Sequence, residues 1–133
     1  MLQYEYAYKT ILNKPWFGYG LDKYAFLDLS LVPFSQRQLV IGAHNGYLAI
    51  LAQYGLLFGS IVLSIICYKS IELYKSFRSV KNSDRIYLFI IIFTLVSSFY
   101  ESLITGINEF NTILFWFSLA ILSYSKYSAE YEN

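Results

Sequence analysis

The sequence predicts an all-α membrane protein in which an external amphipathic helix and loop precede three transmembrane helices. Hydrophobic residues make up 56% of the chain and charged residues only 14%, whereas about a quarter of the residues in a typical soluble domain are charged. Three long apolar runs in the later part of the chain can supply the spans. The net charge of +1 argues neither for nucleic acid nor for binding to a charged membrane surface. The expected partner is the lipid bilayer, because too few polar side chains are present to cover a soluble surface.

The external region is predicted to cover residues 1–45. Helical spacing places an apolar face on its first helix, formed by Tyr4, Ala7, Tyr8, Ile11 and Leu12. Pro15, Gly18 and Gly20 end this helix in a tight corner. Charged and polar residues interrupt every apolar run from Leu21 to Ala43, which predicts an irregular loop with short helical pieces.

The transmembrane region is predicted to cover residues 46–133. Its three spans are expected at Gly46 to Tyr68, Ile86 to Thr105 and Phe110 to Tyr124. The last run is short for a crossing, so its helix is expected to include Asn108 or residues beyond Tyr124.

The placement of basic residues predicts the orientation of these spans. The segment Lys69 to Arg85 contains half of the ten basic residues, and the next loop, Gly106 to Asn111, contains none. By the positive-inside rule the loop 69–85 is cytoplasmic, which places the head of the first span outside. Within that span, Gly55 and Gly59 form a small-xxx-small pair, which predicts close approach by another helix.

The only histidine, His44, lies where the external loop turns into the first span. An imidazole at this boundary can accept a proton from a hydroxyl or, when protonated, neutralise a phosphate. The simpler interpretation is that His44 and Asn45 only cap the helix, because asparagine is a preferred N-cap residue.

Glu101 lies near the outer end of the second predicted span. A charge inside a span costs roughly 2.5 to 3.5 kcal/mol on insertion scales unless it meets a partner or lies near an end. If the first two spans are antiparallel, this carboxylate can approach His44 and fix the tautomer of its imidazole. The alternative is a carboxylate that only reaches the membrane interface. Asn108, in the next external turn, could share a polar rim with His44.

Several short motifs follow one another along the chain. Pro15-Trp-Phe-Gly18-Tyr-Gly20 comes after the first helix, His44-Asn45-Gly-Tyr47-Leu48 heads the first span, and Gly55 and Gly59 lie within it. A later segment, Ser-Phe-Tyr-Glu101-Ser-Leu, precedes the last span. In this order and spacing, the motifs resemble those of the O-antigen ligase and polysaccharide polymerase family of bacterial membrane glycosyltransferases. The resemblance covers nearly the whole chain, but only the C-terminal portion of that family's architecture.

The resemblance implies transfer of a glycan from an undecaprenyl-pyrophosphate carrier to an acceptor hydroxyl at the outer face of the cytoplasmic membrane. The enzyme would either polymerise a surface polysaccharide or ligate a glycan to a lipid or protein. The candidate catalytic residues are His44, Asn45 and Glu101, and the candidate substrate-binding residues are Arg37, Tyr47 and Asn108. No metal or other cofactor is expected, because arginines would balance the charge of the pyrophosphate.

Members of the family also carry arginines ahead of the external helix. We therefore expect this chain to be part of a longer protein with further N-terminal spans. Arg37 is the only arginine on the predicted outer side, and its surroundings match no motif of the family. The alternative function belongs to a different class: a small non-catalytic integral membrane protein that packs against a partner through Gly55 and Gly59.

Overall fold

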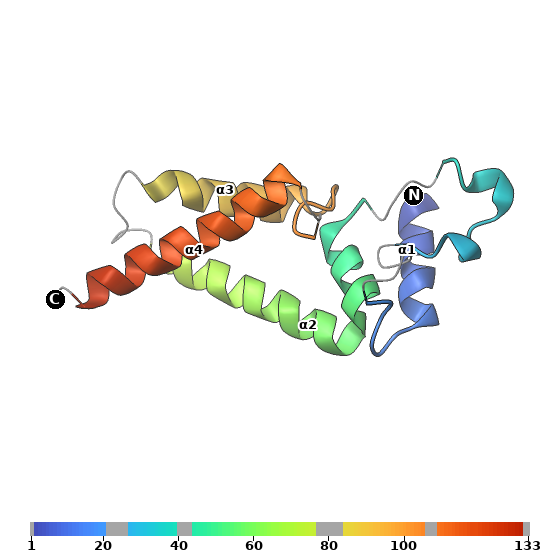
Figure 1. The fold of residues 1–133 in the computed structure, drawn as a ribbon, viewed down its shortest axis with the longest axis horizontal. Helices are drawn as coiled ribbons and strands as arrows, with labels where there is room; N and C mark the ends of the chain where they lie inside the picture. The colour runs from blue at the N-terminus through green and yellow to red at the C-terminus, as the bar shows by residue number, and fades with distance from the viewer. Residues whose placement is uncertain (1, 21–26, 40–43, 77–83, 106–108, 132–133) are drawn as a thin grey trace.

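The computed structural model describes residues 2–20, 27–39, 44–76, 84–105 and 109–131. The regular elements of these residues are all helical, which confirms the predicted all-α class (Figure 1). They are the α-helices α1 (Leu2–Asn13), α2 (Gly46–Lys75), α3 (Arg85–Ser97) and α4 (Phe110–Tyr131) and the short 3-10 helices η1 (Leu29–Leu31) and η2 (Phe34–Gln36). Both 3-10 helices lie in the predicted external loop, so the short helical pieces expected there are confirmed.

Helix α2 is divided at Gly55 into two arms that point in different directions (Figure 1). Gly55 has φ 73° and ψ 176°, a conformation that is essentially restricted to glycine. We call residues 46–54 the short arm and residues 56–75 the long arm. At 1.5 Å per residue the long arm is about 30 Å long, close to the thickness of the hydrocarbon core of a bilayer.

The corner after α1, residues 15–20, closes this break with backbone hydrogen bonds. They run from Tyr19 N–H to the Ala52 carbonyl (3.0 Å), from Gly20 N–H to the Gln53 carbonyl (2.7 Å) and from Leu56 N–H to the Pro15 carbonyl (2.6 Å). The corner therefore pairs backbone groups beside the interruption that the helix itself leaves open.

The close approach predicted at Gly55 and Gly59 exists, but the corner and the short arm make it rather than a separate helix. A Cβ atom added at Gly55 would lie 2.3 Å from the carbonyl oxygen of Trp16. A Cβ atom added at Gly59 would lie 3.0 Å from Cδ2 of Leu51 in the short arm. The two glycines thus allow the chain to pack against itself at the bend.

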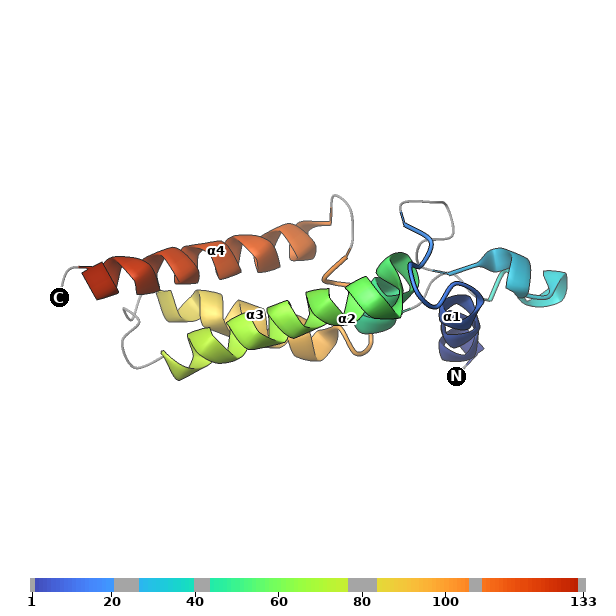
Figure 2. The ribbon, with the colours of Figure 1, turned by 90° about the horizontal axis from the view of Figure 1, so that it is seen from below.

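Helix α1 lies beside the short arm, and the face that it buries differs from the predicted one (Figures 1 and 2). The buried residues are Tyr6, Ala7, Thr10 and Ile11. The prediction is correct for Ala7 and Ile11, whereas Tyr4, Tyr8 and Leu12 are exposed. Tyr6 and Ala7 pack with Leu27, Val32 and Ala49, so this smaller core joins α1, the loop and the short arm.

The loop causes this difference, because it offers polar partners to hydroxyl groups on α1. The hydroxyl of Tyr6 donates to Oε1 of Gln36 at 2.8 Å. The hydroxyl of Thr10 accepts from the backbone N–H of Asp28 at 2.9 Å. A face that includes these hydroxyls can be buried since its polar groups are paired.

The long arm of α2 packs with α3 and α4 around the larger core, and α4 contacts α3 most extensively (Figure 2). The buried apolar residues of this core are Ile50, Ile66, Leu73, Leu88, Ile91, Ile104, Phe115, Leu119 and Leu122. Two of these residues lie outside the long arm, α3 and α4, because Ile50 is in the short arm and Ile104 follows α3. They extend the larger core toward the short arm, beside which α1 lies.

Within the described residues, only α2 is long and apolar enough to cross a membrane, so the three predicted transmembrane helices are not supported. Helix α3 is apolar but has 13 residues and is about 20 Å long. Helix α4 has 22 residues and extends beyond Tyr124, as expected for it. Its serines and Lys126 make it less apolar than α2.

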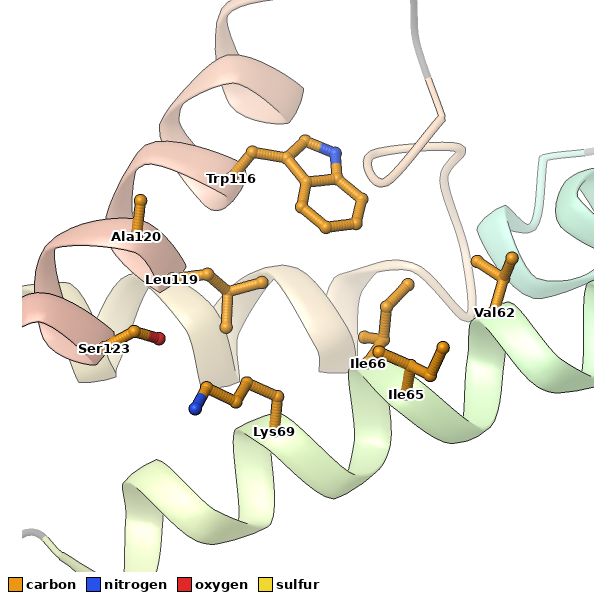
Figure 3. Close-up of a pocket in the computed structure, with 8 residues that line it drawn as sticks. All are labelled: Val62, Ile65, Ile66, Lys69, Trp116, Leu119, Ala120 and Ser123. Carbon is orange, nitrogen blue, oxygen red and sulfur yellow. The ribbon is translucent and has the colours of Figure 1, made fainter. Parts of the chain in front are cut away.

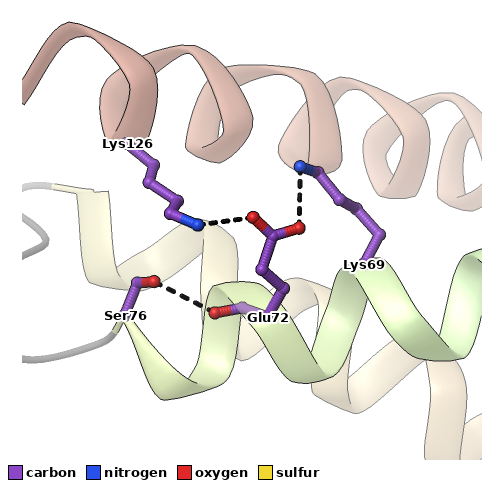
Figure 4. A network of polar contacts seen from close by, with 4 residues as sticks. All are labelled: Lys69, Glu72, Ser76 and Lys126. Carbon is purple, nitrogen blue, oxygen red and sulfur yellow. Dashed lines mark hydrogen bonds and ion pairs between the residues drawn. The ribbon is translucent and has the colours of Figure 1, made fainter. Parts of the chain in front are cut away.

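A charged network joins the C-terminal parts of α2 and α4 (Figure 4). The carboxylate of Glu72 accepts from Lys69 at 3.0 Å and also from Lys126. The hydroxyl of Ser76 donates to the backbone carbonyl of Glu72 at 3.1 Å. Because the carboxylate lies between two lysines, its charge is compensated where the two helices meet.

Candidate functional site

Three α-helices contact the turn that follows α3, residues 98–105, which we call the post-α3 turn. From α2, the N–H of Gly46 donates to the carbonyls of Ser98 (2.8 Å) and Glu101 (3.1 Å). From α1, the hydroxyl of Tyr4 donates to the carbonyl of Phe99 at 2.7 Å. From α4, Thr112 and Trp116 donate to the carbonyls of Leu103 (2.7 Å) and Ile104 (3.3 Å). The turn therefore lies at the junction of the fold.

The prediction of a helix from Ile86 to Thr105 is wrong beyond Ser97. The carbonyls of Ser98, Phe99 and Glu101 accept hydrogen bonds from α1 and α2. The hydroxyl of Ser98 also returns to the carbonyl of Thr94 at 2.6 Å, a local bond that competes with helix continuation. Tertiary contacts thus end α3 within a run that is apolar by composition.

Asn45 is the N-cap of α2, and its side chain also binds the post-α3 turn. Its side-chain oxygen accepts from the N–H groups of Tyr47 (3.0 Å) and Leu48 (2.9 Å). Its amide nitrogen donates to the carbonyl of Phe99 at 3.0 Å. With 7% of its surface exposed, Asn45 has the contacts of a helix cap, which is the simpler interpretation that the sequence allowed for it.

The backbone at His44 is held in the left-handed region, with φ 41°. For a residue other than glycine such a conformation costs about 1–3 kcal/mol, and it persists only where the surrounding structure imposes it. The next two residues impose it here, because Asn45 and Gly46 are both hydrogen-bonded to the post-α3 turn. Gly46 also has to be small, since an added Cβ atom would lie 3.2 Å from Cβ of Ser98.

The structure brings His44 and Glu101 together. Nδ1 of His44 lies 3.4 Å from Oε2 of Glu101, and the two side chains are 36% and 60% exposed. The distance is that of an ion pair when the imidazole is protonated, and it is slightly longer than a typical N–H···O hydrogen bond. Both groups remain open to solvent on one side, so a substrate can reach them.

The approach of the two residues was predicted, but the position of Glu101 within a span was not correct. Glu101 lies in the post-α3 turn and not in a helix. Its N–H donates to the carbonyl of Ser97 at 3.0 Å. The carboxylate therefore lies in a turn, with 60% of its side chain exposed.

Of the three residues predicted to bind substrate, neither Tyr47 nor Arg37 is hydrogen-bonded to His44 or Glu101 in the part of the chain that the structure describes. The hydroxyl of Tyr47 donates to the carbonyl of Leu95 at 2.6 Å, and its ring packs on Phe99. Arg37 donates through Nε to the carbonyl of Val32 at 3.0 Å, and among the described residues no hydrogen bond or ion pair joins it to His44 or Glu101. Asn108 lies outside the described residues.

Asp28 anchors the external loop through a buried network that sequence patterns did not indicate. Its carboxylate accepts from Tyr19 at 2.7 Å and from the N–H and hydroxyl of Ser30 at 2.8 and 2.5 Å. Burial alone would raise the pKa of Asp28, but the hydrogen bonds from Ser30 and Tyr19 and the charge of Lys14 outweigh it and lower the pKa. The loop before His44 is therefore anchored to the corner by an ionised carboxylate.

In the part of the chain that the structure describes, no group of three histidine, cysteine or acidic side chains lies close enough to hold a metal ion. Comparison of the chain with known protein families, curated proteins and solved structures finds no match. The chemistry of this site is thus inferred from the residues themselves, of which His44 and Glu101 are the two reactive groups in contact.

Proposed function

We propose that this chain is part of a membrane glycosyltransferase that polymerises or ligates glycans from an undecaprenyl-pyrophosphate carrier at the outer face of the cytoplasmic membrane. The observation that carries the proposal is the pair of His44 and Glu101, 3.4 Å apart at the head of the one described helix that can cross a membrane. A base at the membrane boundary is what transfer from a lipid carrier to a hydroxyl acceptor requires.

The orientation of the pair supports a specific division of roles. Nδ1 of His44 faces Glu101, so the neutral imidazole that carries its proton on Nδ1 has a free Nε2 lone pair. Nε2 accepts the proton of the acceptor hydroxyl as its oxygen bonds to the anomeric carbon of the donor. The bond from that carbon to the pyrophosphate oxygen breaks, and the carrier pyrophosphate leaves with the electron pair. The Glu101 carboxylate stabilises the imidazolium that forms.

The leaving pyrophosphate needs positive charge, and Arg37 is the candidate on this side of the chain. Its Nε is engaged by the loop, whereas its terminal amino groups have no partner among the described residues and are available to phosphate oxygens. Asn45 and Tyr47 serve as positioning residues in this proposal, because their polar groups bond to backbone around the post-α3 turn.

We also propose a multi-pass topology in which His44 is external and the basic loop 69–85 is cytoplasmic. The long arm of α2 supplies one crossing, and in this proposal α3 and α4, which pack with it, lie in the same membrane. This orientation places the network of Lys69, Glu72 and Lys126 at the cytoplasmic end, where basic residues are favoured.

The proposal is tested by measuring glycan transfer in membranes that contain the full-length protein and a lipid-linked oligosaccharide donor. His44→Ala is expected to lower transfer at least 100-fold, since a positioned base contributes about 10²–10⁴-fold, while the amount of protein in the membrane stays normal. Ser35→Ala, an exposed position in the same external region, is the matched control and should transfer at the wild-type rate. Wild-type transfer by a well-expressed His44→Ala protein would overturn the proposal.

A further inference from the structure

Two adjacent hollows lie between α2 and α4, and we call them together the cleft. The first, which we call the upper chamber, has a volume of about 250 Å³ and lies between the bend of α2, the post-α3 turn and the start of α4. The second, which we call the lower groove, has a volume of about 460 Å³ and follows the long arm and α4 (Figure 3). Val62, Ile66 and Trp116 line both hollows, so the two adjoin.

The upper chamber contains a buried hydroxyl group without a partner. The hydroxyl oxygen of Thr105 is buried and unpaired, and Thr105 lines the chamber. Gln53, a residue that is 4% exposed, lines the same chamber. Buried donors and acceptors are almost always paired in folded proteins, so the Thr105 hydroxyl indicates that a polar ligand completes the chamber.

The lower groove has a different character, because apolar side chains form most of its lining. Val62, Ile65 and Ile66 project from α2 toward Trp116 and Leu119 of α4 (Figure 3). The charged residue in its lining, Lys69, lies at the far end and is paired with Glu72 at 3.0 Å (Figure 4). The groove therefore suits a hydrocarbon chain.

We propose that this cleft binds an uncharged lipid, with a hydroxyl-bearing head in the upper chamber and a single aliphatic chain in the lower groove. At the roughly 30 Å³ that a water molecule takes in the liquid, the chamber holds about eight water-sized groups, which is enough for a head of the size of glycerol. Gln53 can both donate to and accept from hydroxyl groups, and Thr105 adds a further donor.

The head is uncharged because the lining of the upper chamber contains no acidic, basic or histidine side chain. A phosphate placed there would be a buried charge without a compensating cation, which is strongly unfavourable. The lipid proposed for this cleft thus differs in chemistry from the pyrophosphate carrier of the proposed reaction. It is also independent of that reaction, since His44 and Glu101 do not line the cleft.

Native mass spectrometry of the purified full chain in detergent tests the proposal with three probes that share one oleoyl chain. Monoolein is expected to bind at least about fivefold more tightly than methyl oleate, which lacks the hydroxyl head, because one hydrogen bond to a buried group has about this effect. Oleoyl lysophosphatidic acid, which adds a phosphate to the same glycerol, is expected to bind more weakly than monoolein.

One substitution and two control variants locate the head of the bound lipid. Thr105→Val keeps the shape of the side chain without its hydroxyl and should weaken monoolein binding about fivefold while leaving methyl oleate binding unchanged. Ser60→Ala, on α2 outside the cleft lining, is the matched control and should bind like wild type, as should His44→Ala. Equal binding of monoolein and methyl oleate by the wild-type chain would overturn the proposal, and so would tighter binding of the phosphate lipid.

Discussion

The backbone at His44 shows how single residues prepare this site. Its left-handed conformation, with φ 41°, turns the chain just before α2 so that the imidazole faces Glu101. Asn45 and Gly46 hold this turn, because each is bonded to a backbone carbonyl of the post-α3 turn. Strain of this kind concentrates at functional sites, where it fixes a reactive group before the substrate arrives.

The acid sensitivity of the external loop should depend on Asp28. Since the pKa of this carboxyl is lower in the folded state than its usual 3.8, its contribution to stability is complete above that value and is lost as the pH falls below it. Asp28→Asn should therefore destabilise the protein at pH 7 and flatten its loss of stability in acid. Thermal unfolding followed by limited proteolysis between pH 3 and 7 measures both effects.

The matched control for this prediction is Glu5→Gln, which removes an exposed carboxylate from the same region. Glu5 pairs only with Lys9, four residues on along α1, and exposed pairs of this kind contribute little. Its stability at pH 7 should stay close to that of wild type. An Asp28→Asn protein as stable as Glu5→Gln at pH 7 would contradict the prediction.

At the residue scale, the sequence allowed the contact between His44 and Glu101 to be predicted, but not the roles of the residues around it. His44 and Glu101 were identifiable because each is a polar or charged group beside an apolar run, where such residues are uncommon. Thr105 lies in a similar run but carries no charge, so only the missing partner of its buried hydroxyl and its place in the chamber distinguish it. Asp28 was not recognised for a related reason, since its partners are scattered along the chain.

The bend of α2 is the central feature at the scale of elements. Gly18 and Gly55 approach each other so closely that an added Cβ atom on Gly18 would lie 2.5 Å from the backbone nitrogen of Gly55. Because the corner bonds to both sides of the break, it fixes the direction in which the short arm leaves the long arm. That direction determines where His44 lies relative to the post-α3 turn.

Two alanine substitutions in the corner should differ sharply. Gly18 and Gly20 both have positive φ, 65° and 64°, but only Gly18 faces crowded backbone, whereas nothing lies within 4 Å of a Cβ atom at Gly20. Gly20→Ala should cost only the backbone strain, about 1–2 kcal/mol. Gly18→Ala should separate the corner from α2 and lower the melting temperature much further. Equal melting temperatures for the two variants would show that the corner does not hold the bend.

The sequence indicated these elements only in part, and each difference has a physical cause. The corner was predictable from Pro15, Gly18 and Gly20, since proline and glycine mark turns without any tertiary information. The break at Gly55 was not, because glycine also occurs within regular transmembrane helices. The end of α3 at Ser97 likewise depends on hydrogen bonds from α1 and α2, which local patterns do not contain.

The whole molecule is organised as two packed regions that share α2. One comprises α1, the loop and the short arm around the smaller core, and the other comprises the long arm, α3 and α4 around the larger core. The division between the two cores falls within α2, near the break at Gly55. The post-α3 turn connects the two regions, and the pair of His44 and Glu101 lies there.

Membrane topology can be tested by thiol labelling in a Cys67→Ser background. Position 35 lies in the loop that is predicted to be external and position 79 in the basic segment 69–85. In intact cells a membrane-impermeant thiol reagent should modify Ser35→Cys and spare Ser79→Cys until the membrane is permeabilised, as the positive-inside rule requires. Modification of position 79 alone before permeabilisation would reverse the proposed orientation.

The fold class could be predicted from composition, because a chain with so few charged residues and long apolar runs has few alternatives to helices. The number of crossings could not be settled in this way. Hydropathy counts apolar residues whether they face lipid or protein, and α3 shows that a run of suitable composition can end after 13 helical residues. The helix ends are set by packing at the post-α3 turn.

The most direct test of the central claim is a double-mutant cycle on glycan transfer, with His44→Gln, Glu101→Gln and the two combined in the full-length protein. If the two residues act as one base, each single change lowers transfer, and the double variant is no slower than the slower single variant. Effects that simply multiply, or a Glu101→Gln protein with wild-type transfer, would contradict the claim that the pair forms the site.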